Sequence, residues 1–242
     1  MENIMNNFVW KMKAKAKRFA ELKKQRGMSL LEVIIVLGII GTMAAAVVIL
    51  AQRAFSSQDI TDLVDNTNSI RVAAGNAYHD EGIYPTEVGN AINLTPATIS
   101  TLKGAEAPMV ATLVQLGQLS ASEIKNGISG DYFQMQGVKL TTDAEADSTK
   151  GFILDINGLD AGECRSVLTQ LGNQWDYVEV STAAAGANPE VPGALDTDLA
   201  AATAVEGVLR SLVAGGDATI TPERAAQACN DNSDNAVILG SK

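Results

Sequence analysis

Residues 33–51 form an uncharged, mainly apolar run near the start of the chain, directly after a stretch rich in lysine and arginine. A helix needs about 20 such residues to cross a bilayer, so this run is long enough to span a membrane. Basic residues before a spanning segment favour a cytoplasmic N-terminus. The sequence therefore predicts a membrane segment with most of the chain on the far side.

Charge is divided unevenly along the chain. Residues 1–27 hold eight of the 18 basic side chains and two of the 28 acidic ones. Residues 28–242 therefore carry ten basic and 26 acidic side chains, a net charge of −16. Nucleic-acid binding favours a basic face, so an acidic body with 5% aromatic residues makes a nucleic-acid partner unexpected.

One carboxylate, Glu32, lies just before the apolar run. A cleaved secretory signal is one interpretation, but its apolar core is usually 7–15 residues, shorter than this run. A plain membrane anchor is a second, but it gives no reason for Gly27 or Glu32. An ionised group inside a spanning segment costs about 2–3 kcal/mol at the centre and usually has a partner.

A third interpretation supplies such a partner. Cleavage after Gly27 would free the α-amine of Met28, four residues before Glu32. Positions i and i+4 share one face of a helix, so the amine could pair with Glu32 of its own chain. It could equally pair with Glu32 of a neighbouring copy, which would neutralise two buried charges and fix the stagger between copies.

The stretch RGMSLLEVIIVLGIIG resembles the cleavage and assembly signature of type IV prepilins. Methionine after the cut, a long leader and a large body resemble the type IVb branch. The later stretches VILAQRAFSSQ and NSIRVA, with a Tyr-Pro pair after the helix, are similar to the toxin-coregulated and longus-like pilins within it. The resemblance implies that a prepilin peptidase cuts between Gly27 and Met28, methylates the Met28 amine, and leaves Glu32 to direct assembly.

The function that this resemblance implies is that of a structural subunit, not an enzyme. The subunit would polymerise with copies of itself into a surface filament for adhesion, bundling and aggregation, with the host cell surface as a possible partner. It would sit in the inner membrane with the pilus assembly machinery before joining the extracellular filament. The alternatives are a minor pilin, a type II secretion pseudopilin, or an anchored ligand-binding ectodomain that never polymerises.

The chain is expected to form an α+β fold of the type IV pilin kind, with a leader at residues 1–27. One long helix is predicted over about 28–80, apolar over 28–51 and amphipathic over 52–80, where it would pack on an antiparallel sheet. Gly38 and Gly41 in the apolar half indicate close helix packing. The resemblance adds that this region unwinds locally in the filament.

The remaining sequence divides into a connecting region, 81–130, with short helices, and a sheet domain, 131–242. Ser120 and Glu123 have the spacing of a helix capping box. Alternation and turn residues predict strands at 132–140, 151–158, 175–180, 218–221 and 235–240. Helices are predicted at 160–171, about 198–213 and 222–229, and a surface loop at 181–196.

The two cysteines, Cys164 and Cys229, could form a bridge or remain buried thiols. The membrane segment places them in an oxidising compartment, which favours the bridge. The resemblance implies the same pairing, bracketing a variable region 164–229.

Few residues indicate site chemistry. A lone histidine, His79, is a poor candidate for catalysis or metal binding. Asp143, Glu145 and Asp147 could bind Ca²⁺, although a solvated turn is the preferred interpretation. Residues 231–237 lack the glycine and later glutamate of a calcium loop, and the acceptor pattern at 93–95 matches glycosylation by chance. No cofactor and no metal are expected.

Overall fold

The computed structural model describes residues 29–86, 88–145 and 148–242. The chain falls into two compact units, Met1–Arg53 and Ala54–Lys242, which are described separately. Helix α2 (Leu30–Ala77) supplies the helical residues of the first unit and continues into the second. The single long helix predicted from the sequence is confirmed, with each end within three residues of the expected one.

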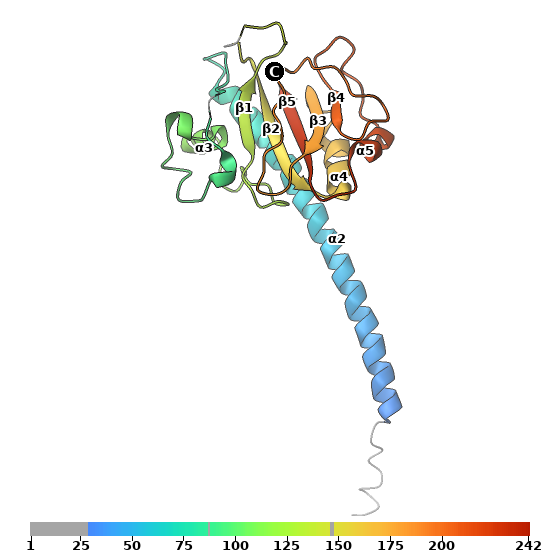
Figure 1. The fold of residues 1–242 in the computed structure, drawn as a ribbon. Helices are drawn as coiled ribbons and strands as arrows, with labels where there is room; N and C mark the ends of the chain where they lie inside the picture. The colour runs from blue at the N-terminus through green and yellow to red at the C-terminus, as the bar shows by residue number, and fades with distance from the viewer. Residues whose placement is uncertain (1–28, 87, 146–147) are drawn as a thin grey trace, which may run out of the picture. The chain divides into compact units, whose positions relative to one another are not determined.

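The second unit is built on one antiparallel sheet. Its spatial order is β1-β2-β5-β3-β4, so the last strand in sequence lies at the centre between β2 and β3 (Figure 1). The strands are β1 (Gln134–Val138), β2 (Gly151–Leu159), β3 (Tyr177–Thr182), β4 (Gly207–Arg210) and β5 (Asn235–Ser241). A central β5 means that the C-terminal residues complete the sheet.

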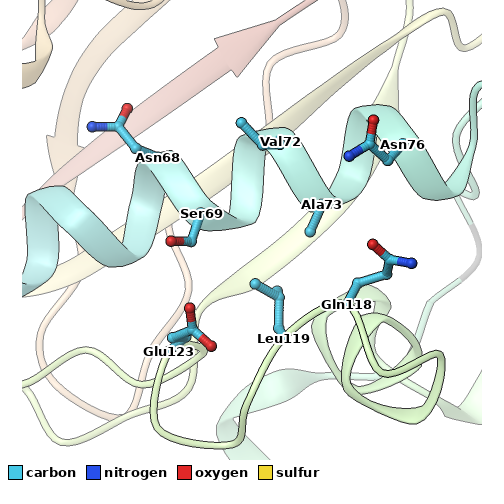
Figure 2. Close-up of a pocket in the computed structure, with 8 residues that line it drawn as sticks. All are labelled: Asn68, Ser69, Val72, Ala73, Asn76, Gln118, Leu119 and Glu123. Atoms are coloured by element: carbon cyan, nitrogen blue, oxygen red, sulfur yellow. The ribbon is translucent and has the colours of Figure 1, made fainter.

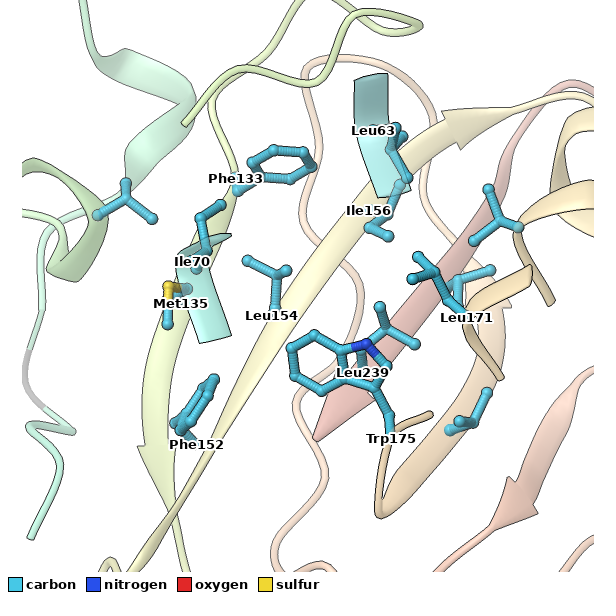
Figure 3. Close-up of a cluster of buried hydrophobic side chains, with 14 of the residues drawn as sticks. Leu63, Ile70, Phe133, Met135, Phe152, Leu154, Ile156, Leu171, Trp175 and Leu239 are labelled. Carbon is cyan, nitrogen blue, oxygen red and sulfur yellow. The ribbon is translucent and has the colours of Figure 1, made fainter. Parts of the chain in front are cut away.

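The main core lies between the sheet and its helices. The buried positions of α2 recur at helical spacing, which gives the helix one stripe to pack: Ile60, Leu63, Thr67, Ile70, Ala73 and Ala74. Against them lie Leu154 and Ile156 of β2 and Leu239 of β5, with Trp175 beside them (Figure 3). The amphipathic half of α2 therefore packs on the sheet, as the sequence predicted.

Two further helices lie close to the disulfide. Helix α4 (Ala161–Leu171) begins at a capping box in which Asp160 and Glu163 bond each other's main-chain N–H groups. Helix α5 (Pro222–Ala228) begins at Thr221, whose hydroxyl accepts from the N–H of Arg224. α4 contributes Val167, Leu168 and Leu171 to the main core, so its apolar stripe faces the sheet.

The connecting region contains short elements, as predicted. They are the 3-10 helices η1 (Ala91–Asn93) and η2 (Gly104–Glu106) and helix α3 (Met109–Gln115). At Ser120 the main-chain N–H and the hydroxyl both donate to the Glu123 carboxylate, at 2.8 and 2.7 Å. These bonds close a turn, but no helix follows. The helix start indicated by the capping pattern at Ser120 and Glu123 is therefore absent.

Two predicted elements are wrong. The helix expected at about 198–213 is absent, and β4 forms within that range, paired with β3. Glu206 and Gly207 have φ values of 67° and 96°, which a right-handed helix cannot accommodate. The strand expected at 218–221 is also absent, since the Asn173 side chain bonds both the N–H and the C=O of Ile220, at 2.9 and 3.1 Å.

The sheet face opposite α2, called the outer face, carries a second and smaller cluster. Its buried members are Val138, Ile153, Tyr177, Leu195, Val208 and Ile238. Leu195 comes from the connection between β3 and β4. A Cβ at Gly151 or Gly240 would meet the Leu195 side chain at 2.8 Å, so these two glycines leave the space that it fills.

Candidate functional site

The apolar half of α2 exposes its side chains around the whole helix. Leu30 is 78% exposed, Leu50 is 66% exposed, and none of the helix's most apolar 18-residue window is buried. By length and composition, this helix could cross a membrane. Full burial of a large apolar side chain contributes about 1.5–3 kcal/mol, so this surface favours contact with lipid or with other helices.

Glu32 lies in the first turn of α2 and is exposed. Ser29, directly before the helix, accepts a hydrogen bond at its hydroxyl from the N–H of Leu31 at 3.3 Å. Ser29 therefore caps the start of the helix. The Glu32 carboxylate lies near the positive end of the helix dipole, which stabilises a negative charge there. The sequence analysis missed Ser29, although a serine three residues before a glutamate is a helix-start signal.

The predicted cleavage site, Gly27 and Met28, lies outside the residues that the structure describes. Gly38 and Gly41 lie among the described residues, and α2 is continuous through both. A Cβ at either glycine would meet nothing within 4 Å in the single chain. Contacts within the described chain therefore give no reason for glycine at these positions.

The predicted disulfide is confirmed. Cys164 on α4 is bonded to Cys229 at the end of α5, with their Cα atoms 6.1 Å apart. Both cysteines are buried in the main core. The bridge joins two short helices through cysteines that lie 65 residues apart in sequence.

The C-terminal half of α2 is fastened to the sheet by Arg71. Its guanidinium donates to the Ser241 hydroxyl at 2.9 Å and to the Gln174 carbonyl at 2.6 Å. It also approaches the Asp176 carboxylate at 3.5 Å and lies 5.0 Å from the centre of the Trp175 ring. One side chain therefore connects the helix to the C-terminal strand and to the turn before β3.

A groove of about 440 Å³ runs beside the exposed face of α2. Figure 2 shows Asn68, Ser69 and Asn76 of the helix on one side and Gln118, Leu119 and Glu123 on the other. Hydrogen bonds from Ser120 hold the pKa of Glu123 below its usual value. Three amides, one hydroxyl and three apolar side chains share the lining with Glu123, so one carboxylate is the only titratable group among these lining residues.

The other residues considered for chemistry do not form a site. His79 is exposed beyond the end of α2 and pairs with Asp80 at 3.2 Å. Asp143 and Glu145 are exposed, while Asp147 lies outside the described residues. In the turn after α5, the Asn235 amide donates to the carbonyls of Asn230 and Asn232. Among the described residues no group of three His, Cys, Asp or Glu could hold a metal ion.

An exposed apolar half-helix, an acid in its first turn and an antiparallel sheet on its second half define the class of the type IV pilins. Residues 22–48 match the family model of the prokaryotic N-terminal methylation motif. Residues 112–224 match that of the toxin-coregulated pilus subunit TcpA. The two matches fall on the helix start and on the globular body.

Relatives and a solved structure agree with these family matches. The chain is 34% identical to a toxin coregulated pilin of Vibrio cholerae serotype O1, over 79% of this chain and 77% of that protein. A second Vibrio cholerae toxin coregulated pilin is also 34% identical, over 78% and 76%. The crystal structure of TcpA, a type IV pilin from the El Tor biotype of Vibrio cholerae, has the same fold, with a TM-score of 0.60, 24% identity and coverage of 76% of this chain and 99% of that one.

The chain belongs to the toxin-coregulated pilin family and is a type IV pilus subunit. The predicted family, fold class and structural role are therefore confirmed. Members of this family are structural subunits rather than enzymes, and they form extracellular filaments from copies of one chain. The methylation motif indicates processing by a prepilin peptidase.

Proposed function

We propose that this chain is the major subunit of a type IVb pilus. The observation that carries the proposal is the exposure of the apolar half of α2, where every residue from Leu30 to Leu50 except the partly buried Val33 is exposed. A soluble monomer would leave this surface in water, whereas a bundle of such helices buries it in a filament core. Glycines at positions 38 and 41 would let neighbouring helices approach closely.

The register between copies would come from one ion pair. Removal of residues 1–27 leaves the α-amine of Met28, and N-methylation keeps its positive charge. This amine would pair with Glu32 of the adjoining copy inside the apolar bundle. An unpaired carboxylate there is costly, so copies that join in another stagger would be disfavoured.

The parts of the chain would then have separate roles. Residues 1–27 are the leader, 28–51 the membrane and filament-core half-helix, and 52–80 the half that carries the globular body. The connecting region 81–130 and the sheet domain 131–242 would face outward, with 164–229 bracketed by the disulfide. The subunit would be held in the inner membrane until the assembly machinery adds it to the filament. The filament would function in adhesion, bundling and aggregation.

Mass spectrometry of filaments sheared from the cell surface tests this proposal. The expected species is residues 28–242 with a methylated Met28 and an intact disulfide, as the most abundant protein of the filament. A trace amount would instead indicate a minor pilin or a secretion pseudopilin. The uncut chain alone in the envelope would contradict the proposal and favour an anchored ectodomain.

Replacement of Glu32 tests the ion pair. Glu32→Ala is expected to abolish surface filaments while cleavage after Gly27 remains largely intact, because the peptidase acts before the copies join. Filament yield is measured by shearing, and cleavage by the mass of the membrane-bound subunit. Glu81→Ala removes an exposed carboxylate beyond α2 and serves as the control, with wild-type yield. Normal filaments from Glu32→Ala would disprove the ion-pair model.

A further inference from the structure

A carboxyl group is buried without a partner on the outer face of the sheet. Asp155 of β2 is 4% exposed, and neither of its side-chain oxygens has a hydrogen-bond partner among the described residues. A buried carboxylate without hydrogen bonds or a counter-charge is strongly unfavourable. The folded chain therefore favours the protonated form of Asp155.

The strand register places Asp155 in a row without a positively charged side chain. Residues directly opposite one another in an antiparallel sheet share a face, and the row through Asp155 reads Gln134, Asp155, Ile238, Glu179 and Val208. Ile238 and Val208 belong to the outer-face cluster. The carboxyl thus shares its face with aliphatic side chains.

The charged side chains near Asp155 on this face are acidic, so they repel an ionised Asp155 and do not neutralise it. Glu179 of β3 accepts a hydrogen bond from the Tyr177 hydroxyl at 2.6 Å. Burial first, and then the charge of Glu179, raise the pKa of Asp155 from 3.8 to about 8. Burial also raises the pKa of Glu179, to which Glu190 of the β3–β4 connection adds its charge. The neighbours of Asp155 in its row, Gln134 and Ile238, carry no charge.

Residues 183–197, called the outer-face segment, cross this side of the sheet. At the first end, the Asn157 amide donates to the Ala187 carbonyl, and the N–H of Gly186 donates to Asp131, at 2.8 and 2.7 Å. At the other end, the N–H of Leu195 donates to the Lys139 carbonyl at 3.0 Å. The segment is therefore anchored to the sheet at both ends.

Between these anchors the segment has little main-chain support. Among the described residues, no main-chain N–H from 188 to 194 donates to a main-chain carbonyl. Pro189 and Pro192 have no N–H to donate. This part is held by hydrogen bonds from the Asn188 amide to Asn90 and from the Thr197 hydroxyl to the Ala194 carbonyl, at 3.2 and 2.9 Å, and by the burial of Pro189.

We propose that Asp155 is a proton-dependent latch for the outer-face segment. The segment stays closed while the Asp155 carboxyl keeps its proton, and it opens when that proton is lost to solvent. An ionised Asp155 carboxylate is stable only if water can reach it. Residues 188–194 would be displaced to admit that water, because they have the fewest main-chain hydrogen bonds to the sheet. Opening would admit water to the outer-face cluster, to which Ile153, Tyr177 and Ile238 belong.

Hydrogen–deuterium exchange of the full chain in detergent tests the latch. Exchange is compared at pH 6.5 and pH 9.0, with labelling times shortened in proportion to the hydroxide concentration. The amides of Gly186 and Leu195, whose hydrogen bonds hold the segment at its two ends, are expected to exchange about tenfold faster at pH 9.0 after this correction, while β5, in the centre of the same sheet, is unchanged. An equal rate at both pH values would overturn the proposal.

Variants separate the latch from a general alkaline effect. Asp155→Asn should keep the segment closed at both pH values, and Asp198→Asn, an exposed carboxylate just beyond the segment, should behave as wild type. Glu179→Gln removes a negative charge that raises the pKa of Asp155, so the midpoint of opening should move to lower pH. This measurement remains informative even if Asp155→Asn does not fold. Persistent opening in Asp155→Asn, or an unchanged midpoint in Glu179→Gln, would refute the latch.

Discussion

Two side chains on β2, Asp155 and Asn157, share the outer face of the sheet and differ in how their polar atoms are satisfied. The Asn157 amide donates to Asp131 and Ala187, and its oxygen accepts from the Ser129 hydroxyl at 2.9 Å. Asp155 has no partner among the described residues. Paired buried groups stabilise one arrangement of the chain, whereas an unpaired carboxyl makes stability depend on pH.

The sign of this dependence follows from the raised pKa of Asp155. The unfolded chain releases the proton near pH 4, whereas the folded chain keeps it to about pH 8. Between these values folding must take up a proton, so rising pH lowers the free energy of unfolding by at most about 1.4 kcal/mol per pH unit. This loss is complete above pH 8.

Asp155→Asn should remove this slope. In urea unfolding at pH 5.0 and 7.5, the variant is expected to gain stability relative to wild type at the higher pH. The amide side chain introduced by this substitution carries no charge at either pH, so folding of the variant takes up no proton at this position. Asp198→Asn, whose carboxylate is exposed, should keep the wild-type slope. If Asp155→Asn lost as much stability as wild type between the two pH values, the assignment to Asp155 would be wrong.

Among the elements, α5 is a short helix that depends on its attachments. It spans Pro222–Ala228, and helices of this length are unstable alone. The disulfide fixes its end to α4, and the Arg224 guanidinium donates to the Ala204 carbonyl at 2.7 Å. The bridge therefore connects α5 and the approach to β4 to the main core.

Replacement of both cysteines measures this attachment. Cys164→Ala with Cys229→Ala is expected to lower the free energy of unfolding by about 4 kcal/mol, because the bridge closes a long loop in the unfolded chain. The loss is read from the denaturant midpoint, and amide exchange should rise first in α5. Thr169→Ala, on the exposed side of α4, is the control and should change stability little. An unchanged midpoint in the double variant would contradict this role of the bridge.

At the scale of the whole molecule, charge opposes close packing of the bodies. Residues 28–242 carry a net charge of −16, and filaments bring many such chains together. The screening length falls from about 30 Å at 0.01 M salt to about 8 Å at 0.15 M. Filaments of this subunit should therefore associate laterally more readily as salt is added.

Sedimentation of sheared filaments checks this expectation. The fraction in bundles should rise between 10 and 150 mM NaCl, because screening reduces repulsion between acidic surfaces. Asp143→Asn with Glu145→Gln removes two exposed acids and should lower the salt needed for bundling. Bundling that weakens as salt is added would show that attractive ion pairs, not repulsion, govern the contact.

Much of the proposed assembly site could be predicted from the sequence, because its signals are local. The uncharged run 33–51, the single acid Glu32 and the amphipathic stripe after residue 52 are properties of consecutive residues. Strand β2 and helix α4 were predicted within a residue of their ends. Two cysteines in an oxidising compartment allowed only one pairing within the chain.

Other features were decided only by contacts between distant residues. The alanine-rich stretch before β4 has helical propensity, yet pairing with β3 sets its strand. Ile220 is held by Asn173, 47 residues away, and so forms no strand. The sequence alone determined which half-helix is apolar and where its charge lies, because hydropathy is a property of the residues themselves. Tertiary structure decided that β5 is central and that Asp155 is buried, because strand pairing and burial exist only once distant segments meet.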